Sequence, residues 1–139
     1  MRELEAERIV DASPPVVRRR LDPATLVEYE GSFEVLGTHA DGDATVVRAG
    51  GGGMEVAFRF EPREDGYHYT QAGGAGPFDA METWVTVDPA DDDRRARVAF
   101  RSTVSLGLPL PAVTDRVAAW KRRGELRRAL DALEADLDG

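Results

Sequence analysis

The chain has 139 residues, 42% of them hydrophobic, and no cysteine; 18 basic and 26 acidic residues give a net charge of −8. This length predicts a single domain covering residues 1–139, and the charge argues against binding to nucleic acid. The absence of cysteine excludes disulfides and thiolate chemistry. No apolar run approaches the ~20 residues of a membrane span, and the charged N-terminus does not resemble a signal peptide, so we expect a cytoplasmic protein without integral membrane association.

The basic residues are almost all arginine, because Lys121 is the one lysine. An acidic surface nearly free of lysine is typical of proteins from a salt-rich cytosol, and we interpret the chain as an acidic halophilic protein. A GC-rich genome, which also favours arginine over lysine, is the alternative. Equal stability in dilute buffer and in molar KCl would contradict the halophilic interpretation.

The first thirty residues predict a strand followed by two short helices. Residues 4–11 alternate loosely and predict a strand. Ser13 then suits an N-cap and Pro14 the first position of a helix over 14–21. Asp22 and Pro23 repeat this signal and predict a second helix to about residue 28.

The next eighty residues predict six consecutive strands, joined by short antiparallel connections. The expected strands cover residues 32–38, 44–49, 54–61, 67–72, 78–87 and 96–106. The strand over 54–61 alternates most cleanly, with apolar side chains at even numbers, so we expect those side chains to face inward. In the strand over 67–72, either Tyr67 and Tyr69 or His68 and Thr70 could face inward.

The last thirty residues predict one long helix over 112–137, which would span roughly 39 Å. Leu126, Leu130, Leu133 and Leu137 form one stripe that continues to Ala119 and Ala112, whereas Val113, Val117 and Trp120 form a second stripe. Two hypotheses follow. A straight helix would leave space under its small alanines, and a helix bent at Gly124 would turn the second stripe inward as pocket wall.

The order strand, two short helices, six strands and long helix resembles the START-like (SRPBCC) superfamily, which includes polyketide cyclases, dehydrases and lipid-binding proteins. The resemblance covers the whole chain as a pattern. It is carried by Ala12-Ser13-Pro14-Pro15-Val16-Val17, Leu21-Asp22-Pro23, Gly66-Tyr67 and the terminal helix with Trp120. It implies an α+β helix-grip fold, with a seven-stranded curved antiparallel sheet around the long helix and an apolar cavity between them. The family has no universal catalytic signature.

Candidate ligand-binding residues are large apolar side chains of the strands and of the terminal helix, and core packing is the alternative for each. They are Met54, Val56, Phe58, Phe60, Met81, Trp84, Phe100, Val113, Val117 and Trp120. Further polar groups that could contact a ligand are Tyr29 and Arg59. We expect the entrance near residues 73–77 and the start of the terminal helix.

Candidate acid or base groups are His68, Tyr69, Glu82 and Arg101, although no spacing joins them to a nucleophile. Two distant histidines and no cysteine give no ligand set for a metal, and no cofactor is expected. The arginines at 18–20, 122–123 and 127–128 are expected to pair with the acidic surface, or to dock an acidic partner.

Three functions are consistent with this pattern. The first is a binding or carrier protein for an apolar small molecule such as a lipid, a quinone or a polyketide-like compound. The second is a cyclase- or dehydrase-type enzyme, which would lose its main support if His68 and Glu82 pointed outward. The third is an interaction module with a vestigial cavity. The sequence leaves the ligand and the oligomeric state open.

Overall fold

The computed structural model describes residues 2–72, 78, 80–106 and 111–138. Seven strands form one sheet, and three helices accompany them. The strands are β1 (Arg2–Val10), β2 (Glu34–Asp41), β3 (Ala44–Gly51), β4 (Met54–Arg63), β5 (Gly66–Ala72), β6 (Ala80–Pro89) and β7 (Ala96–Ser105). The helices are α1 (Pro14–Arg20), α2 (Pro23–Glu30) and α3 (Pro111–Asp138).

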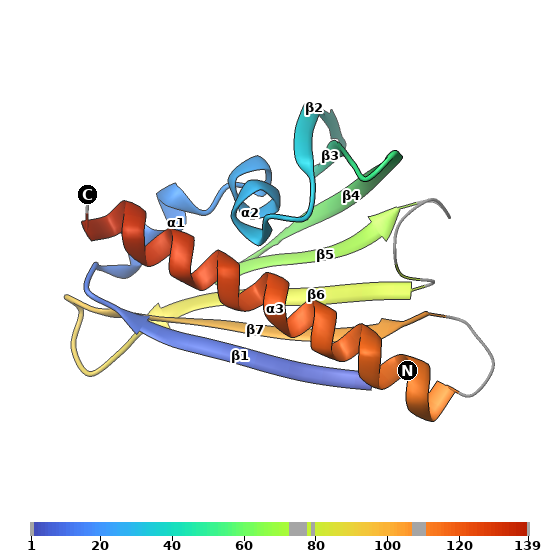
Figure 1. Cartoon of the computed structure of the whole chain (residues 1–139). Helices are drawn as coiled ribbons and strands as arrows, with labels where there is room; N and C mark the ends of the chain where they lie inside the picture. The colour runs from blue at the N-terminus through green and yellow to red at the C-terminus, as the bar shows by residue number, and fades with distance from the viewer. Residues whose placement is uncertain (1, 73–77, 79, 107–110, 139) are drawn as a thin grey trace.

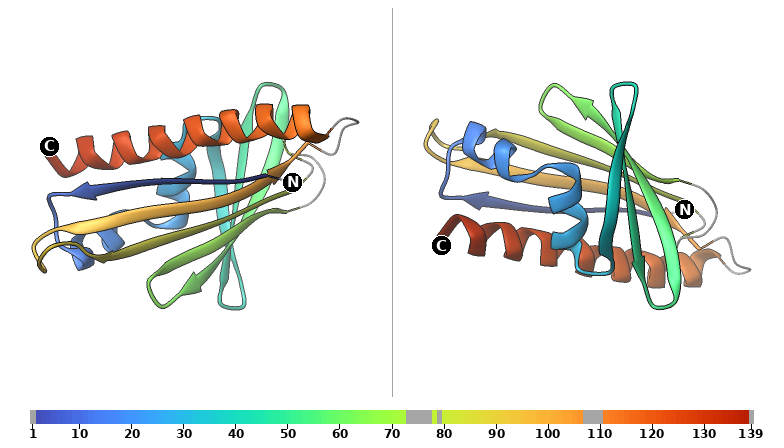
Figure 2. Two further views of the ribbon diagram at one scale, coloured as in Figure 1. Left: turned by 90° about the horizontal axis from the view of Figure 1, so that it is seen from below. Right: turned by 90° about the horizontal axis from the view of Figure 1, so that it is seen from above.

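The strand order is β1-β7-β6-β5-β4-β3-β2, with every neighbouring pair antiparallel. The sheet curves, and α3 runs along one of its faces (Figures 1 and 2). Helix α3 packs on β1, β7 and α2, while α1 contacts β6 and β7. The predicted α+β helix-grip architecture, with two short helices after the first strand, is therefore confirmed. We call the face that α3 covers the inner face and the opposite one the outer face.

The two short helices begin where their sequence signals predict, and they end within two residues of the predicted positions. Asp22 caps α2 through its side chain, which accepts a hydrogen bond from the Thr25 amide at 3.3 Å. Gly31 ends α2 with a positive φ of 81°, a conformation that glycine adopts at little cost. Ser13 occupies the N-cap position of α1 but makes no side-chain capping bond, so Pro14 carries the start signal there.

The hairpin between β4 and β5 requires glycine at position 66. A Cβ atom there would lie 1.9 Å from the carbonyl oxygen of Val85 on β6. No larger residue fits unless the strands separate, so this glycine fixes how closely β5 and β6 approach.

Helix α3 is continuous through Gly124. The side chains that face the sheet are those that the straight-helix hypothesis places there. Ala119, Leu126, Leu130 and Leu133 are all at most 2% exposed. The prediction that a bend turns Val113, Val117 and Trp120 inward is wrong, because these side chains are 62%, 56% and 75% exposed. Their stripe lies on the opposite side of a regular helix from the leucines. The side chain of Ala112 lies outside the described residues.

None of the helices, as far as the structure describes them, is long and apolar enough to cross a membrane.

Candidate functional site

Three hydroxyl groups lie side by side on the inner face of the sheet. The strand register pairs Tyr69 of β5 with Thr83 of β6, and Thr83 with Ser102 of β7. Their side chains share one face because facing residues on paired strands point the same way. Thr83 and Ser102 are joined by a hydrogen bond of 2.8 Å, and all three residues are buried. The sheet thus offers a short polar row within an apolar interior.

Arg122 of α3 points into this row and is 1% exposed. Its Nη2 donates to Thr83 Oγ1 at 2.8 Å and to the Tyr69 hydroxyl at 3.1 Å. Its Nε donates to Ser102 Oγ at 3.3 Å. A guanidinium presents five N–H donors in a fixed plane, so one side chain can bind all three hydroxyls at once.

Two buried carboxylates balance the charge of Arg122. Glu30, the last residue of α2, binds both Nη atoms, and Glu125 accepts from Nη1 at 3.1 Å. Tyr69 donates its hydroxyl hydrogen to Glu30 at 2.6 Å. Lys121, which is partly exposed, also pairs with Glu125 at 3.1 Å. Two positive side chains, Arg122 and Lys121, therefore face the two carboxylates. We call Glu30, Tyr69, Thr83, Ser102, Arg122 and Glu125 the Arg122 cluster.

The cluster shifts the pKa values of its members. Burial alone would lower the pKa of Arg122, but the Glu30 carboxylate, with Tyr69 and Glu125, raises it above its ordinary value. Burial and the neighbouring Glu30 raise the pKa of Tyr69. Burial opposes ionisation of Glu125, but Arg122 beside it lowers the pKa of that carboxyl below 4.5. At neutral pH, Arg122 and Glu125 are therefore charged and Tyr69 carries its proton.

The cluster can bind a polar group, but only by exchange. All of its buried side-chain nitrogen and oxygen atoms have partners. A carbonyl, hydroxyl or carboxylate on a ligand could take the place of one carboxylate oxygen, and Tyr69 could donate a proton to it. Among the described residues, no group of three or more His, Cys, Asp and Glu could hold a metal ion.

The stability of the protein should depend on the ionisation of Glu125. Because the folded state lowers its pKa, the contribution of this carboxylate is complete above pH 4.5 and is lost as the pH falls below that value. Near neutral pH, we expect the urea midpoint of the wild type to be higher than that of Glu125→Gln. This difference should shrink below pH 4.5. Urea titrations followed by circular dichroism from pH 7 to pH 3 measure it. A difference that stays constant down to pH 3 would contradict the assignment.

A second row of side chains crosses the outer face of the sheet. The register pairs Glu61 with His68, His68 with Trp84, Trp84 with Arg101, and Arg101 with Glu5. The Arg101 guanidinium lies 4.4 Å from the centre of the Trp84 ring, and the His68 and Trp84 rings are 5.0 Å apart. His68 Nε2 also lies 2.6 Å from a Glu82 carboxylate oxygen.

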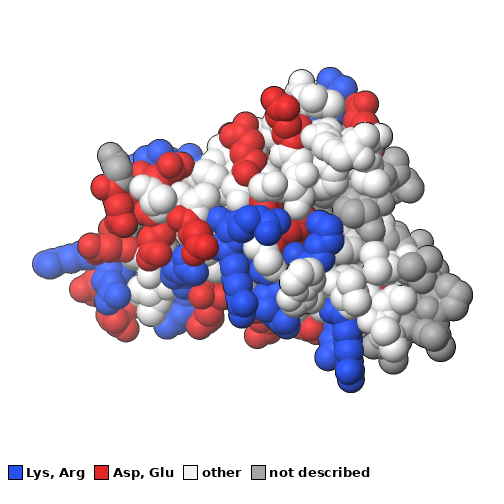
Figure 3. Space-filling view, viewed as in Figure 1, with Lys and Arg blue, Asp and Glu red and all other residues white. Residues whose placement is uncertain are grey.

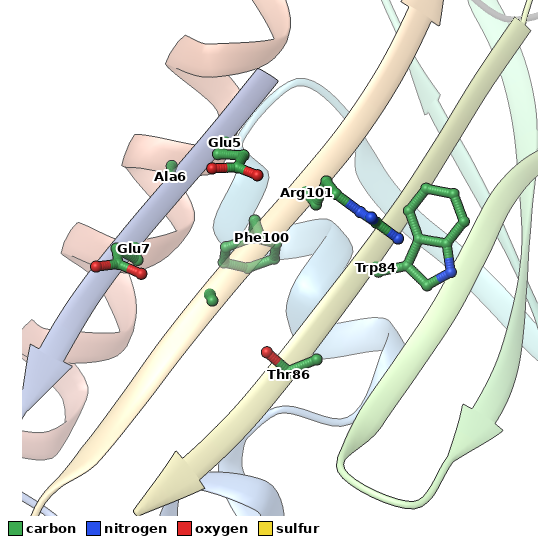
Figure 4. A pocket seen from close by; sticks show the side chains of 8 residues that line it. Glu5, Ala6, Glu7, Trp84, Thr86, Phe100 and Arg101 are labelled. Atoms are coloured by element: carbon green, nitrogen blue, oxygen red, sulfur yellow. The ribbon is translucent and has the colours of Figure 1, made fainter. Parts of the chain in front are cut away.

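This row borders an open hollow of about 430 Å³ between β1 and β6, shown in Figure 4. Four of the predicted site residues therefore lie on the outer face: His68, Glu82, Trp84 and Arg101. They do not face the interior because they alternate with inward Tyr69, Thr83 and Ser102. The hypothesis of a cyclase- or dehydrase-type enzyme therefore loses its main support, because His68 and Glu82 both point outward.

The predicted ligand-binding residues divide between the interior and the surface. Val56, Phe58, Phe60, Met81 and Phe100 are buried on the inner face. Met54 begins β4 at the rim of the sheet and is 40% exposed, so the inward alternation begins only at Val56. In β5, Tyr67 and Tyr69 face inward rather than His68 and Thr70. Both tyrosine rings lie against Phe60.

The remaining polar candidates are engaged elsewhere. The Tyr29 hydroxyl donates to Asp136 near the end of α3, and burial together with Asp136 raises the pKa of Tyr29 to about 12. Arg59 pairs with Asp41 at the surface. The predicted entrance at residues 73–77 lies outside the described residues.

Sequence reasoning missed every member of the Arg122 cluster except Tyr69. The run of basic residues favours a surface position for Arg122, next to Arg123. A signal for burial is nevertheless present, since Arg122 stands three residues after Ala119 and four before Leu126, on the same helix face. Its inward position follows from that spacing.

No family model and no curated protein matches the chain. Solved structures do match it. A protein from Thermus thermophilus is 23% identical with a TM-score of 0.73, covering 96% of this chain and 95% of that one. A START superfamily protein from Mycobacterium smegmatis is 14% identical with a TM-score of 0.72, covering 98% and 97%. The Zhui aromatase/cyclase from Streptomyces sp. R1128 is 16% identical with a TM-score of 0.72, covering 98% and 95%. This chain therefore has the START-like helix-grip fold.

Proposed function

From the START-like helix-grip fold, we propose that the protein binds an apolar small molecule between the sheet and the first half of α3. The ligand class would be a lipid, a quinone or a polyketide-like compound with one polar group. The observation that carries the proposal is Arg122, a fully buried charge beside three hydroxyl groups inside an apolar core. Ligand pockets typically combine apolar walls with a few converging polar groups.

The walls of the proposed site come from both layers. Phe60, Met81 and Phe100 belong to the inner face of the sheet, and Ala118 and Ala119 belong to the facing side of α3. The small alanines leave α3 close to the sheet without large side chains of their own. The polar group of the ligand would bind to Tyr69, Thr83 and Arg122 at the end of the site where the Arg122 cluster lies.

A cyclase- or dehydrase-type enzyme is the second candidate, and Tyr69 is the observation that favours it. Among the predicted acid or base groups, Tyr69 alone is on the inner face. Its raised pKa keeps it protonated, which suits a proton donor to a ligand carbonyl rather than a base. The structural neighbours include an aromatase/cyclase.

The binding proposal can be tested by native mass spectrometry of protein purified in molar KCl and exchanged into ammonium acetate. We expect an additional mass that is released by organic solvent. Tyr69→Phe, which removes one hydroxyl from the cluster, should retain less of this ligand. His68→Gln, on the same strand but the opposite face, should retain as much as wild type.

Two results would count against the proposal. One is a wild-type protein that carries no additional mass and binds no hydrophobic dye. The other is loss of ligand in His68→Gln with retention in Tyr69→Phe, which would place binding on the outer face.

A further inference from the structure

The outer side of the first half of α3 combines exposed apolar residues with arginines. Val113, Val117 and Trp120 stand at spacings of four and three residues and so form a stripe along the helix axis. Their exposures of 62%, 56% and 75% are unusual for such side chains, especially in a contiguous stripe. Nothing in the described part of the chain covers them.

Cations flank this stripe on both sides. Arg116, Arg123 and Arg127 lie along one flank, and Lys121 and Arg128 lie along the other. Figure 3 shows Lys and Arg gathered over the middle of α3, while acidic residues occupy the side toward its C-terminal end. We call the surface formed by Val113, Arg116, Val117, Trp120, Lys121, Arg123, Arg127 and Arg128 the α3 ridge.

Three of the ridge arginines have no carboxylate partner in the described part of the chain. Among the described residues, no Asp or Glu lies within ion-pair distance of Arg116, Arg123 or Arg127. The expectation that Arg123 and Arg127 pair with the acidic surface is therefore wrong. Their charges remain available to another molecule.

A hollow of about 360 Å³ lies on the ridge, and Gly124 is one of the residues that line it. Trp120, Lys121, Arg123, Arg127 and Arg128 also line it. Gly124 contributes no side chain to this hollow, and four cationic side chains line it together with Trp120. The hollow fits a side chain that is apolar at its tip and bordered by carboxylates.

We propose that the α3 ridge binds an acidic amphipathic helical segment of another protein. The ridge from Val113 to Arg127 is roughly 21 Å long, which matches about four turns of a partner helix. The apolar stripe would pack against the partner's apolar side, and the flanking arginines would meet its carboxylates. This inference does not depend on the proposed ligand.

The charge distribution favours a narrow acidic segment over an anionic membrane. Asp131 and Asp138 follow the ridge on the same side of the helix, and the whole chain carries a charge of −8. A flat anionic surface that touched the ridge would also meet these acidic groups and be repelled. A single helix can contact the cationic stretch alone.

A fluorescence titration tests the proposal. Trp84→Phe leaves Trp120 as the one tryptophan, because the chain has two. The probe is a synthetic helix of about four turns with leucine on one side and glutamate on the other. We expect a saturable blue shift of the Trp120 emission, weaker at higher salt. The same peptide with lysine in place of glutamate should produce none.

A matched pair of charge reversals separates specific from general electrostatics. Arg123→Glu/Arg127→Glu on the ridge should weaken binding by about tenfold or more. Arg94→Glu/Arg95→Glu, on the exposed turn between β6 and β7, changes the net charge equally and should leave the affinity unchanged.

Four results would overturn the proposal. They are failure of the glutamate peptide to bind, equal weakening in both reversal variants, tighter binding to vesicles rich in anionic lipid than to the peptide, and self-association through α3 seen by sedimentation.

Discussion

Replacing Arg122 with methionine is expected to lower the free energy of unfolding by about 3–5 kcal/mol. The reason is that Glu30 would remain buried without its counter-charge, Glu125 would keep only Lys121, and the hydroxyls of Thr83 and Ser102 would each lose a donor. Urea denaturation followed by circular dichroism measures the change. Arg123→Met, the next residue of the helix, should change the free energy by no more than about 0.5 kcal/mol.

A compensated variant distinguishes charge from packing. In Arg122→Met/Glu30→Gln/Glu125→Gln, no isolated charge remains, so much of the lost stability should return. If the triple variant is as unstable as Arg122→Met alone, the cost comes from the shape of the site, and the ionic explanation is wrong.

Replacing Phe60 with alanine is expected to cost about 3–5 kcal/mol of stability. Phe60 is 0% exposed, and its ring stacks on Tyr69 with centroids 4.3 Å apart. The alanine variant would leave a cavity in the core beside the Arg122 cluster. Chemical denaturation again provides the measurement.

Met54→Ala is the matched control, because it lies on the same strand and side but at the exposed rim. It should change stability by about 0.5 kcal/mol or less. A double-mutant cycle of Phe60→Ala and Arg122→Met should be non-additive, since Tyr69 contacts both residues. Strict additivity would contradict a shared network.

The architecture was predictable because its signals are local and redundant. Pro14 and Pro23 mark two helix starts, and the alternation from Val56 to Phe60 identifies one strand face without ambiguity. The leucines of α3 repeat at helical spacing over its second half. Each of these patterns depends on residues close in sequence.

The site was less predictable because it depends on pairings between distant residues. In β5, tyrosine and histidine alternate along the strand. Each side chain combines an aromatic ring with a polar group, so the sequence of the strand alone does not show which of them faces the interior. The register with Phe60 decides it in favour of Tyr69. Arg122 looks like a surface residue in a basic run, and its burial depends on Glu30, 92 positions away, as well as on the nearby Glu125.

The same lack of long-range information explains the error at Val113, Val117 and Trp120. Apolar stripes on a helix are usually buried, which favours an inward position. The helix has two such stripes but one sheet to pack against, and the leucine stripe is the one buried against it.

The Arg122 cluster also limits how the protein can move. Its members belong to α2, β5, β6, β7 and α3, so a single guanidinium joins five elements of the fold. The first half of α3 cannot swing away as a lid without leaving an unpaired charge in a medium of low dielectric. Helices α2 and α3 therefore open as one cooperative unit or not at all. A ligand that draws α3 away from the sheet would have to offer a polar partner to the charges that this opening separates.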